Sequence, residues 1–180
     1  MTAAKPNPPR LPLIQTPDDP LAREQFDKLA AGRGILNLHR MMAYAPTLMK
    51  ASGEMALAFR HDSILSRALA EIVILRTAQV ADSDYEWERH VPLARSVGVS
   101  EQQIADVGRW TQSGAFDAKE KAVLKYTETI ARSAPVEDQA FAELQRHLSA
   151  REIVALTMLV GFYVSTAIFI KAMAIPDDNA

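Results

Sequence analysis

A glutamate and a histidine four residues apart, Glu86 and His90, are the side chains in this sequence best placed to move a proton. On an α-helix this spacing puts both side chains on one face. A carboxylate beside an imidazole orients the ring and raises its basicity, as a general base near neutral pH requires. An ordinary pair on a helix surface gives the same pattern, so both interpretations stay open on spacing alone.

A second carboxylate, Glu71, sits inside an apolar run from Ala68 to Val73. A carboxylate on a largely buried helix must be paired, or its pKa must rise. Glu71 is therefore a candidate functional residue. Arg67, one turn earlier, offers the alternative of a buried ion pair without catalytic meaning.

Three further side chains are candidates for substrate binding. Tyr85 and Trp87 flank Glu86 and can wall a pocket, although residues so spaced do not share a helix face, so at least one should be core. Arg76 can bind a substrate carboxylate in bidentate fashion, or it is an exposed arginine near a C-terminal helix end. The other histidines are scattered and form no HExxH motif, so we expect no metal site.

Helices alone are expected to position these residues, because no segment alternates with a period of two. The sequence predicts an all-α bundle of about eight helices, with a hairpin of residues 66–81 and 85–97 holding the candidate site. Pro92 should kink the second helix of this hairpin or shift its start. The other expected helices cover residues 20–31, 36–43, 46–60, 101–111, 118–133, 138–147 and 150–173.

Local signals set several of these boundaries. Asp19 followed by Pro20 is a helix start, and residues 82–84 read as a break followed by a new cap. Three capping boxes pair Ser100 with Gln103, Asp117 with Glu120, and Ser149 with Glu152. Residues 1–20 are rich in proline and lack the apolar core of a secretory signal, so we expect an extended arm followed by one domain over residues 21–180. A weak echo between residues 70–75 and 151–156 suggests an internal duplication.

One segment reaches the lower length limit of a membrane span. Residues 153–170 carry no charge over eighteen positions, but no basic cluster flanks them and polar residues dilute their apolarity. We expect a helix buried in the core or in a subunit interface, and no membrane partner.

The composition narrows the function further. The 180 residues include no cysteine and carry a net charge of -2. A net charge of this sign and size gives no excess of basic residues that would favour binding to nucleic acid. The absence of cysteine excludes disulfides, thiolate metal sites and cysteine nucleophiles. No glycine-rich nucleotide loop and no GxSxG elbow occurs.

The segment around these candidates resembles the carboxymuconolactone decarboxylase and alkylhydroperoxidase D-like superfamily. The resemblance extends from about residue 35 to the C-terminus, and its specific part is residues 70–76 (AEIVILR), 85–90 (YEWERH) and 94–100 (ARSVGVS). Tyr85-Glu86-Trp87 marks what looks like a separate subgroup. The alkylhydroperoxidase branch has a glutamate, a CxxC pair and a histidine, which correspond to Glu71, to positions 83 and 86, and to His90.

The resemblance implies a function in which thiol chemistry has no part. Ser83 and Glu86 replace the two cysteines, and a serine cannot pass through a sulfenic acid, so thiol peroxidase activity is excluded. The decarboxylase branch also has a carboxylate four residues before its histidine. Resemblance to that branch implies that the protein is a cofactor-free lyase or isomerase. Its substrate would be a small, anionic carboxylated lactone or a related enolisable acid.

The resemblance then implies that His90 transfers the proton. Glu86 would orient the His90 imidazole, and Glu71 would tune the charge of that imidazole. Arg76, Tyr85, Trp87 and Ser83 are the candidates for substrate binding. The superfamily forms rings, so the resemblance also implies a homo-oligomer, a trimer or hexamer, and we expect a cytoplasmic protein. The alternative is a ligand-binding or structural protein that has lost catalysis along with its cysteines.

Overall fold

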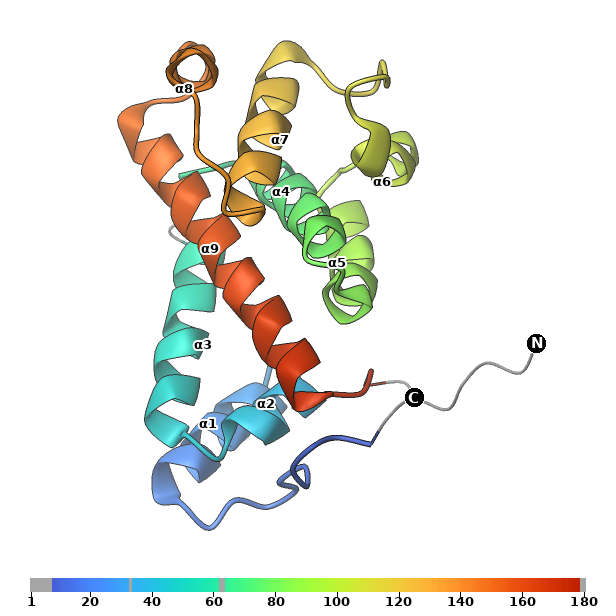
Figure 1. Cartoon of the computed structure of the whole chain (residues 1–180). Coiled ribbons are helices and arrows are strands. Elements are labelled where there is room, and N and C mark those ends of the chain that lie inside the picture. Colours follow the sequence, from blue (N-terminus) through green and yellow to red (C-terminus); the bar gives the residue numbers. More distant parts are fainter. Residues whose placement is uncertain (1–7, 33, 62–63, 179–180) are drawn as a thin grey trace, which may run out of the picture. The chain divides into compact units, whose positions relative to one another are not determined.

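The computed structural model describes residues 8–32, 34–61 and 64–178. In this part of the chain all regular structure is helical, as predicted, and comprises nine α-helices and one 3-10 turn (Figure 1). The helices are α1 (Pro20–Ala30), α2 (Asn37–Met42), α3 (Pro46–His61), α4 (Arg67–Val80), α5 (Asp84–Ser96), α6 (Glu101–Asp106), α7 (Ala118–Ala131), α8 (Asp138–Gln145) and α9 (Ala150–Met173).

The chain divides by its packing into two compact units. Unit 1 comprises Met1–Ala58 and Phe169–Ala180, and unit 2 comprises Phe59–Ile168. Every candidate site residue named from the sequence belongs to unit 2. Unit 1 has its own small apolar core, made by Ala22, Phe26, Ala43 and Met49.

The predicted N-terminal arm falls in unit 1. Its residues 1–7 lie outside the described part of the chain, and residues 8–19 contain no helix. The Arg10 N–H donates to the carbonyl of Met173 at 3.0 Å, and the Pro12 carbonyl accepts from the Tyr44 hydroxyl at 2.9 Å. The Asp19 carboxylate caps α1 by accepting from the N–H groups of Leu21 and Ala22, as the sequence predicted.

Helix α4 is the centre of unit 2. It packs against α5 and α7, and ten consecutive residues from Leu69 to Ala78 are buried. Its residues divide between two apolar clusters: Val73 and Ile74 pack with α7, α8 and α9, whereas Ile72 and Leu75 pack with α5, α6 and α7. A helix covered on all sides has no solvent face, so Glu71 is buried with the rest.

The link from α4 to α5 sets the geometry of the hairpin. Asp82 adopts a positive φ of 52°, a conformation that aspartate tolerates better than most side chains. The Ser83 hydroxyl then caps α5 by accepting from the Glu86 N–H. The predicted break at residues 82–84 is therefore confirmed. Pro92 lies inside α5, which continues through it to Ser96.

The three predicted capping boxes form, at Ser100, Asp117 and Ser149. The helix expected over residues 101–111 is shorter, because α6 ends at Asp106 and a 3-10 turn, Val107–Arg109, follows. The carboxylate of Asp106 accepts from Arg109 Nε at 2.8 Å and from the Ser113 hydroxyl at 2.7 Å. These local side-chain bonds compete with continuation of the helix.

Helix α9 has the predicted bounds, residues 150–173. Among the described residues it alone is long and apolar enough to cross a membrane by length and composition, with 39% of its most apolar window buried. Core helices of globular proteins meet the same criterion. The echo between residues 70–75 and 151–156 falls in the early turns of α4 and α9, which both follow a serine cap.

Candidate functional site

Three side chains from α4 and α5 form a continuous polar chain inside unit 2. His90 Nδ1 lies 2.7 Å from Glu71 Oε2, and Arg67 Nη2 donates to Glu71 Oε1 at 2.5 Å. Glu71 is 1% exposed and His90 is 6% exposed. Since Arg67 holds one carboxylate oxygen, Glu71 is an acceptor, and the consistent assignment has His90 Nδ1–H donating to it.

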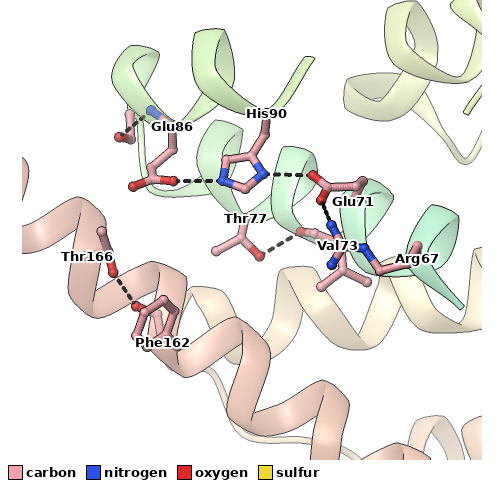
Figure 2. A network of polar contacts seen from close by, with 9 residues as sticks. Arg67, Glu71, Val73, Thr77, Glu86, His90, Phe162 and Thr166 are labelled. Atoms are coloured by element: carbon pink, nitrogen blue, oxygen red, sulfur yellow. Dashed lines mark hydrogen bonds and ion pairs between the residues drawn. The ribbon is translucent and has the colours of Figure 1, made fainter. Parts of the chain in front are cut away.

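The second nitrogen of the same ring faces the other glutamate (Figure 2). His90 Nε2 lies 3.4 Å from Glu86 Oε2. Burial of its carboxyl group raises the pKa of Glu86; His90 and Arg89 oppose this shift, and Glu71 adds to it. With Nδ1–H committed to Glu71, one proton can lie either on Glu86 or on His90 Nε2. The arrangement can therefore both release and accept a proton, as general acid–base catalysis requires.

The two glutamates differ from their expected roles. The sequence assigned orientation of the imidazole to Glu86, one turn earlier on the same helix. The structure gives the short contact to Glu71 on α4, while Glu86 is the more distant partner at the free side of the ring. The shorter of the two contacts to the imidazole therefore comes from the neighbouring helix and not from α5 itself.

A fourth residue, Tyr163, was not among the predicted site residues. It lies on α9, and its ring meets the His90 ring edge to face, with centroids 5.0 Å apart and planes at 88°. Only 8% of Tyr163 is exposed. The signal for it in the sequence was a phenol within an uncharged, apolar helix, where a hydroxyl group needs a polar partner.

The residues at the start of α5 have separate positions. The Ser83 hydroxyl is used as the cap of α5, and Tyr85 is buried, with 7% exposed. Trp87 is partly exposed and lines an open depression of about 300 Å³, together with Ala78, Gln79, Asp82, Ser83 and Asp84. Ser83 and Trp87 thus share a surface hollow, whereas Tyr85 is core, in line with the expectation that Tyr85 and Trp87 would not point the same way.

Arg76 does not join the polar chain around His90. Its guanidinium donates to Glu128 on α7 and to Gln79 Oε1, the latter at 2.7 Å. It is 9% exposed, so it is not the exposed arginine that the sequence allowed as the alternative. Burial, and then the charge of Arg132, lower the pKa of Arg76. Arg67, by contrast, contacts the site through Glu71.

Arg67 and Glu71 form the ion pair at one end of the polar chain. Among residues 8–32, 34–61 and 64–178, no group of three or more histidine, aspartate and glutamate side chains has a geometry that could hold a metal ion.

Comparison with known proteins finds a family model that matches the part of the chain around the candidate site. Residues 46–129 match the carboxymuconolactone decarboxylase family. The uncharacterized protein YnjA of Escherichia coli (strain K12) is 30% identical over 119 residues, which are 65% of this chain and 65% of that protein. Residues 46–129, which match the family model, include α4 and α5, the two helices that carry Glu71, Glu86 and His90.

Solved structures share the fold. An uncharacterized peroxidase-related protein from Silicibacter sp. TM1040 superposes with a TM-score of 0.80 at 20% identity, covering 96% of this chain and 94% of that one. The debrominase Bmp8, in complex with 2,3,4-tribromopyrrole, gives a TM-score of 0.73 at 16% identity, covering 88% and 83%. The match of residues 46–129 to the family model and these shared folds support a place for this cysteine-free chain in the carboxymuconolactone decarboxylase and alkylhydroperoxidase D-like superfamily.

Proposed function

We propose that this protein is a cofactor-free lyase or isomerase that transfers a proton on a small carboxylated lactone or a related enolisable acid. The observation that carries the proposal is the position of His90 between two buried carboxyl groups with different partners. Glu71 is held as an acceptor by Arg67, whereas burial favours the protonated form of Glu86. Two carboxyl groups in unequal environments are suited to separate roles in acid–base catalysis.

The reaction balances without an oxidant or reductant. In a decarboxylation, the bond between the carboxylate and the adjacent carbon breaks, carbon dioxide leaves, and the electron pair moves onto a conjugated carbonyl group as an enolate. The proton shared by Glu86 and His90 Nε2 then passes to the carbon, and solvent restores it. In an isomerisation, the same groups remove a proton from one carbon and return it to another.

The comparisons support a small substrate. The matching family takes its description from a decarboxylase of a carboxylated lactone. The debrominase of the same fold is solved with a five-membered heterocycle bound. A thiol peroxidase reaction is not part of the proposal, because the chain has no cysteine to form a sulfenic acid.

The test is a panel of small carboxylated lactones and β-keto acids, assayed for carbon dioxide release by the wild type and by His90→Gln. We expect release from at least one compound, with a loss of about 100-fold or more in the variant, the usual scale for removing a general acid–base group. Glutamine can still bond to Glu71, so the variant is expected to fold. Equal rates for the variant and the wild type would overturn the assignment of His90.

A second candidate is a ligand-binding or structural protein without catalysis. The observation in its favour is the burial of all three groups, since Glu71, Glu86 and His90 are 1, 4 and 6% exposed. A charged network this well covered also occurs in structural cores. This candidate predicts that no compound in the panel reacts and that none exchanges its α-hydrogen with solvent.

A further inference from the structure

Tyr163 brings a third helix to the proton-transfer groups. Its ring is edge to face with the His90 imidazole at 5.0 Å, and it also touches Phe162, at 5.4 Å. Phe162 in turn packs on Phe59 at 5.6 Å. These ring contacts, with the surrounding apolar cluster of α4, α7 and α9, pack around the Tyr163 ring.

Among the described residues the Tyr163 hydroxyl has no hydrogen-bond partner, and its oxygen is not one of the buried side-chain atoms left without one. The hydroxyl therefore reaches the surface of the chain. The hydroxyl of Tyr126, in the same unit, lies 2.8 Å from Thr157 Oγ1 and is already bonded. Of these two tyrosines, Tyr163 is thus the one whose hydroxyl is available to a molecule from solution.

The charges around Tyr163 keep this hydroxyl protonated. Burial raises the pKa of Tyr163, the carboxylates of Glu86 and Glu71 raise it further, and Arg60 and Arg67 oppose them. The phenol is therefore a neutral donor throughout the physiological pH range. A neutral donor suits an oxygen that is uncharged in the ground state and negative in the transition state.

We propose that the Tyr163 hydroxyl donates a hydrogen bond to the carbonyl oxygen of the substrate and stabilises it as that oxygen becomes an enolate. This inference rests on the proposed function. It narrows the substrate to a compound whose reacting carbon is next to a carbonyl group, such as a lactone or a β-keto acid. The proton moves at that carbon through His90 and Glu86, while the Tyr163 proton stays on its own oxygen.

A binding experiment tests this role without knowledge of the natural substrate. Tetronic acid is a five-membered lactone whose enol is ionised at neutral pH, so it presents an enolate oxygen. The related 2(5H)-furanone has the same ring without that oxygen. Dissociation constants of both compounds would be measured by calorimetry for the wild type, for Tyr163→Phe and for Tyr126→Phe.

We expect the wild type to bind tetronate about tenfold or more tightly than furanone, the usual worth of a hydrogen bond to a charged group. Tyr163→Phe keeps the ring contact with His90 and should lose most of this preference. Furanone affinity should fall less than tetronate affinity in Tyr163→Phe, because a hydrogen bond to its neutral carbonyl is weaker than one to an enolate oxygen. Tyr126→Phe removes an equivalent hydroxyl elsewhere in the unit and should bind tetronate as the wild type does.

Two results would overturn the inference: a wild type without preference for tetronate, or a Tyr163→Phe protein that keeps the full preference. The first of these results overturns the inference even if the variant does not fold. Failure of the proposed function looks different. In that case tetronate still binds selectively through Tyr163, but no compound in the panel releases carbon dioxide or exchanges its proton.

Discussion

Glu71 Oε2 lies 2.7 Å from His90 Nδ1 and so joins the buried helix α4 to the helix that carries the candidate catalytic residues (Figure 2). Arg67 holds the other oxygen of the same carboxylate at 2.5 Å. One glutamate therefore fixes the imidazole, selects its tautomer and leaves Nε2 free to face Glu86. The function of the site and the stability of the α4–α5 hairpin depend on the same side chain.

Replacing Glu71 with glutamine should lower both the activity of the site and the stability of the α4–α5 hairpin. The variant loses the charge that pairs with Arg67, and breaking a largely buried ion pair costs about 3 kcal/mol. Urea denaturation would measure the loss in free energy of unfolding. Glu143→Gln is the matched control, because the exposed Glu143 also contacts a histidine and an arginine, His147 and Arg146. The control should cost less than about 0.5 kcal/mol, and equal losses would contradict the structural role of Glu71.

Glu86 should make stability depend on pH in the acid-to-neutral range. In the unfolded chain its carboxyl titrates near 4.5, and burial raises its pKa in the folded protein. Between these two values the folded state binds more protons, so stability falls as the pH rises through the raised pKa. Glu86→Gln removes the free-energy cost of burying a charged carboxylate at high pH. We expect the variant to be more stable than the wild type by about 1 kcal/mol at pH 8, with a smaller difference at pH 4.

Urea denaturation at several pH values checks this sign. The exposed Glu54, which pairs with Lys50 at 3.8 Å, supplies the control variant Glu54→Gln, whose pH profile should follow the wild type. A Glu86→Gln protein that is less stable than the wild type at every pH would show that the charged carboxylate stabilises the fold.

The homo-oligomer expected from the sequence stays a prediction, and α9 offers a way to test it. Val154, Met158 and Ile168 are 63, 49 and 62% exposed, on the same face as Gly161. A side-chain carbon added at Gly161 would touch nothing within 4 Å, so Gly161→Arg should leave the chain itself folded. We expect light scattering to give a multiple of 19.8 kDa for the wild type and a smaller assembly for the variant.

Gly53 on α3 is a suitable control for that experiment, because it is also helical with open space around it. Gly53→Arg should keep the assembly of the wild type. A wild-type protein that is monomeric at every concentration, or a Gly161→Arg protein with an unchanged mass, would contradict an interface at this face of α9.

Thiol peroxidase activity should be absent. With Ser83 and Glu86 at the positions that correspond to the cysteine pair, no group can be oxidised to a sulfenic acid and reduced again. Consumption of an organic hydroperoxide in the presence of a dithiol should equal the rate without protein. A rate that is proportional to enzyme concentration would show redox chemistry of another kind.

Much of the architecture could be read from local signals. The helix starts at Asp19, Ser100, Asp117 and Ser149 depend on side chains within three residues of each cap, so sequence alone predicts them. The end of α6 was mispredicted, because it depends on bonds from Asp106 to Arg109 and Ser113. Such side-chain bonds leave no periodic signal.

The site itself was only partly predictable. The spacing of Glu86 and His90 gave their shared helix face, and the apolar run around Glu71 gave its burial. Which glutamate would bind which nitrogen depends on the register between α4 and α5, and no sequence pattern reports it. Tyr163 is separated from His90 by most of the chain, so its contact arises only when α9 packs against unit 2's core.

Exchange of an α-hydrogen for solvent deuterium is the most direct measurement of the central claim, that His90 and Glu86 move a proton on an enolisable substrate. Proton NMR would follow the lactone and β-keto acid panel in deuterated buffer with wild type, His90→Gln and Glu86→Gln. The account predicts exchange at a carbon next to a carbonyl group with the wild type, and loss of about 100-fold with His90→Gln. Exchange that His90→Gln retains in full, or no exchange with any compound, would contradict it.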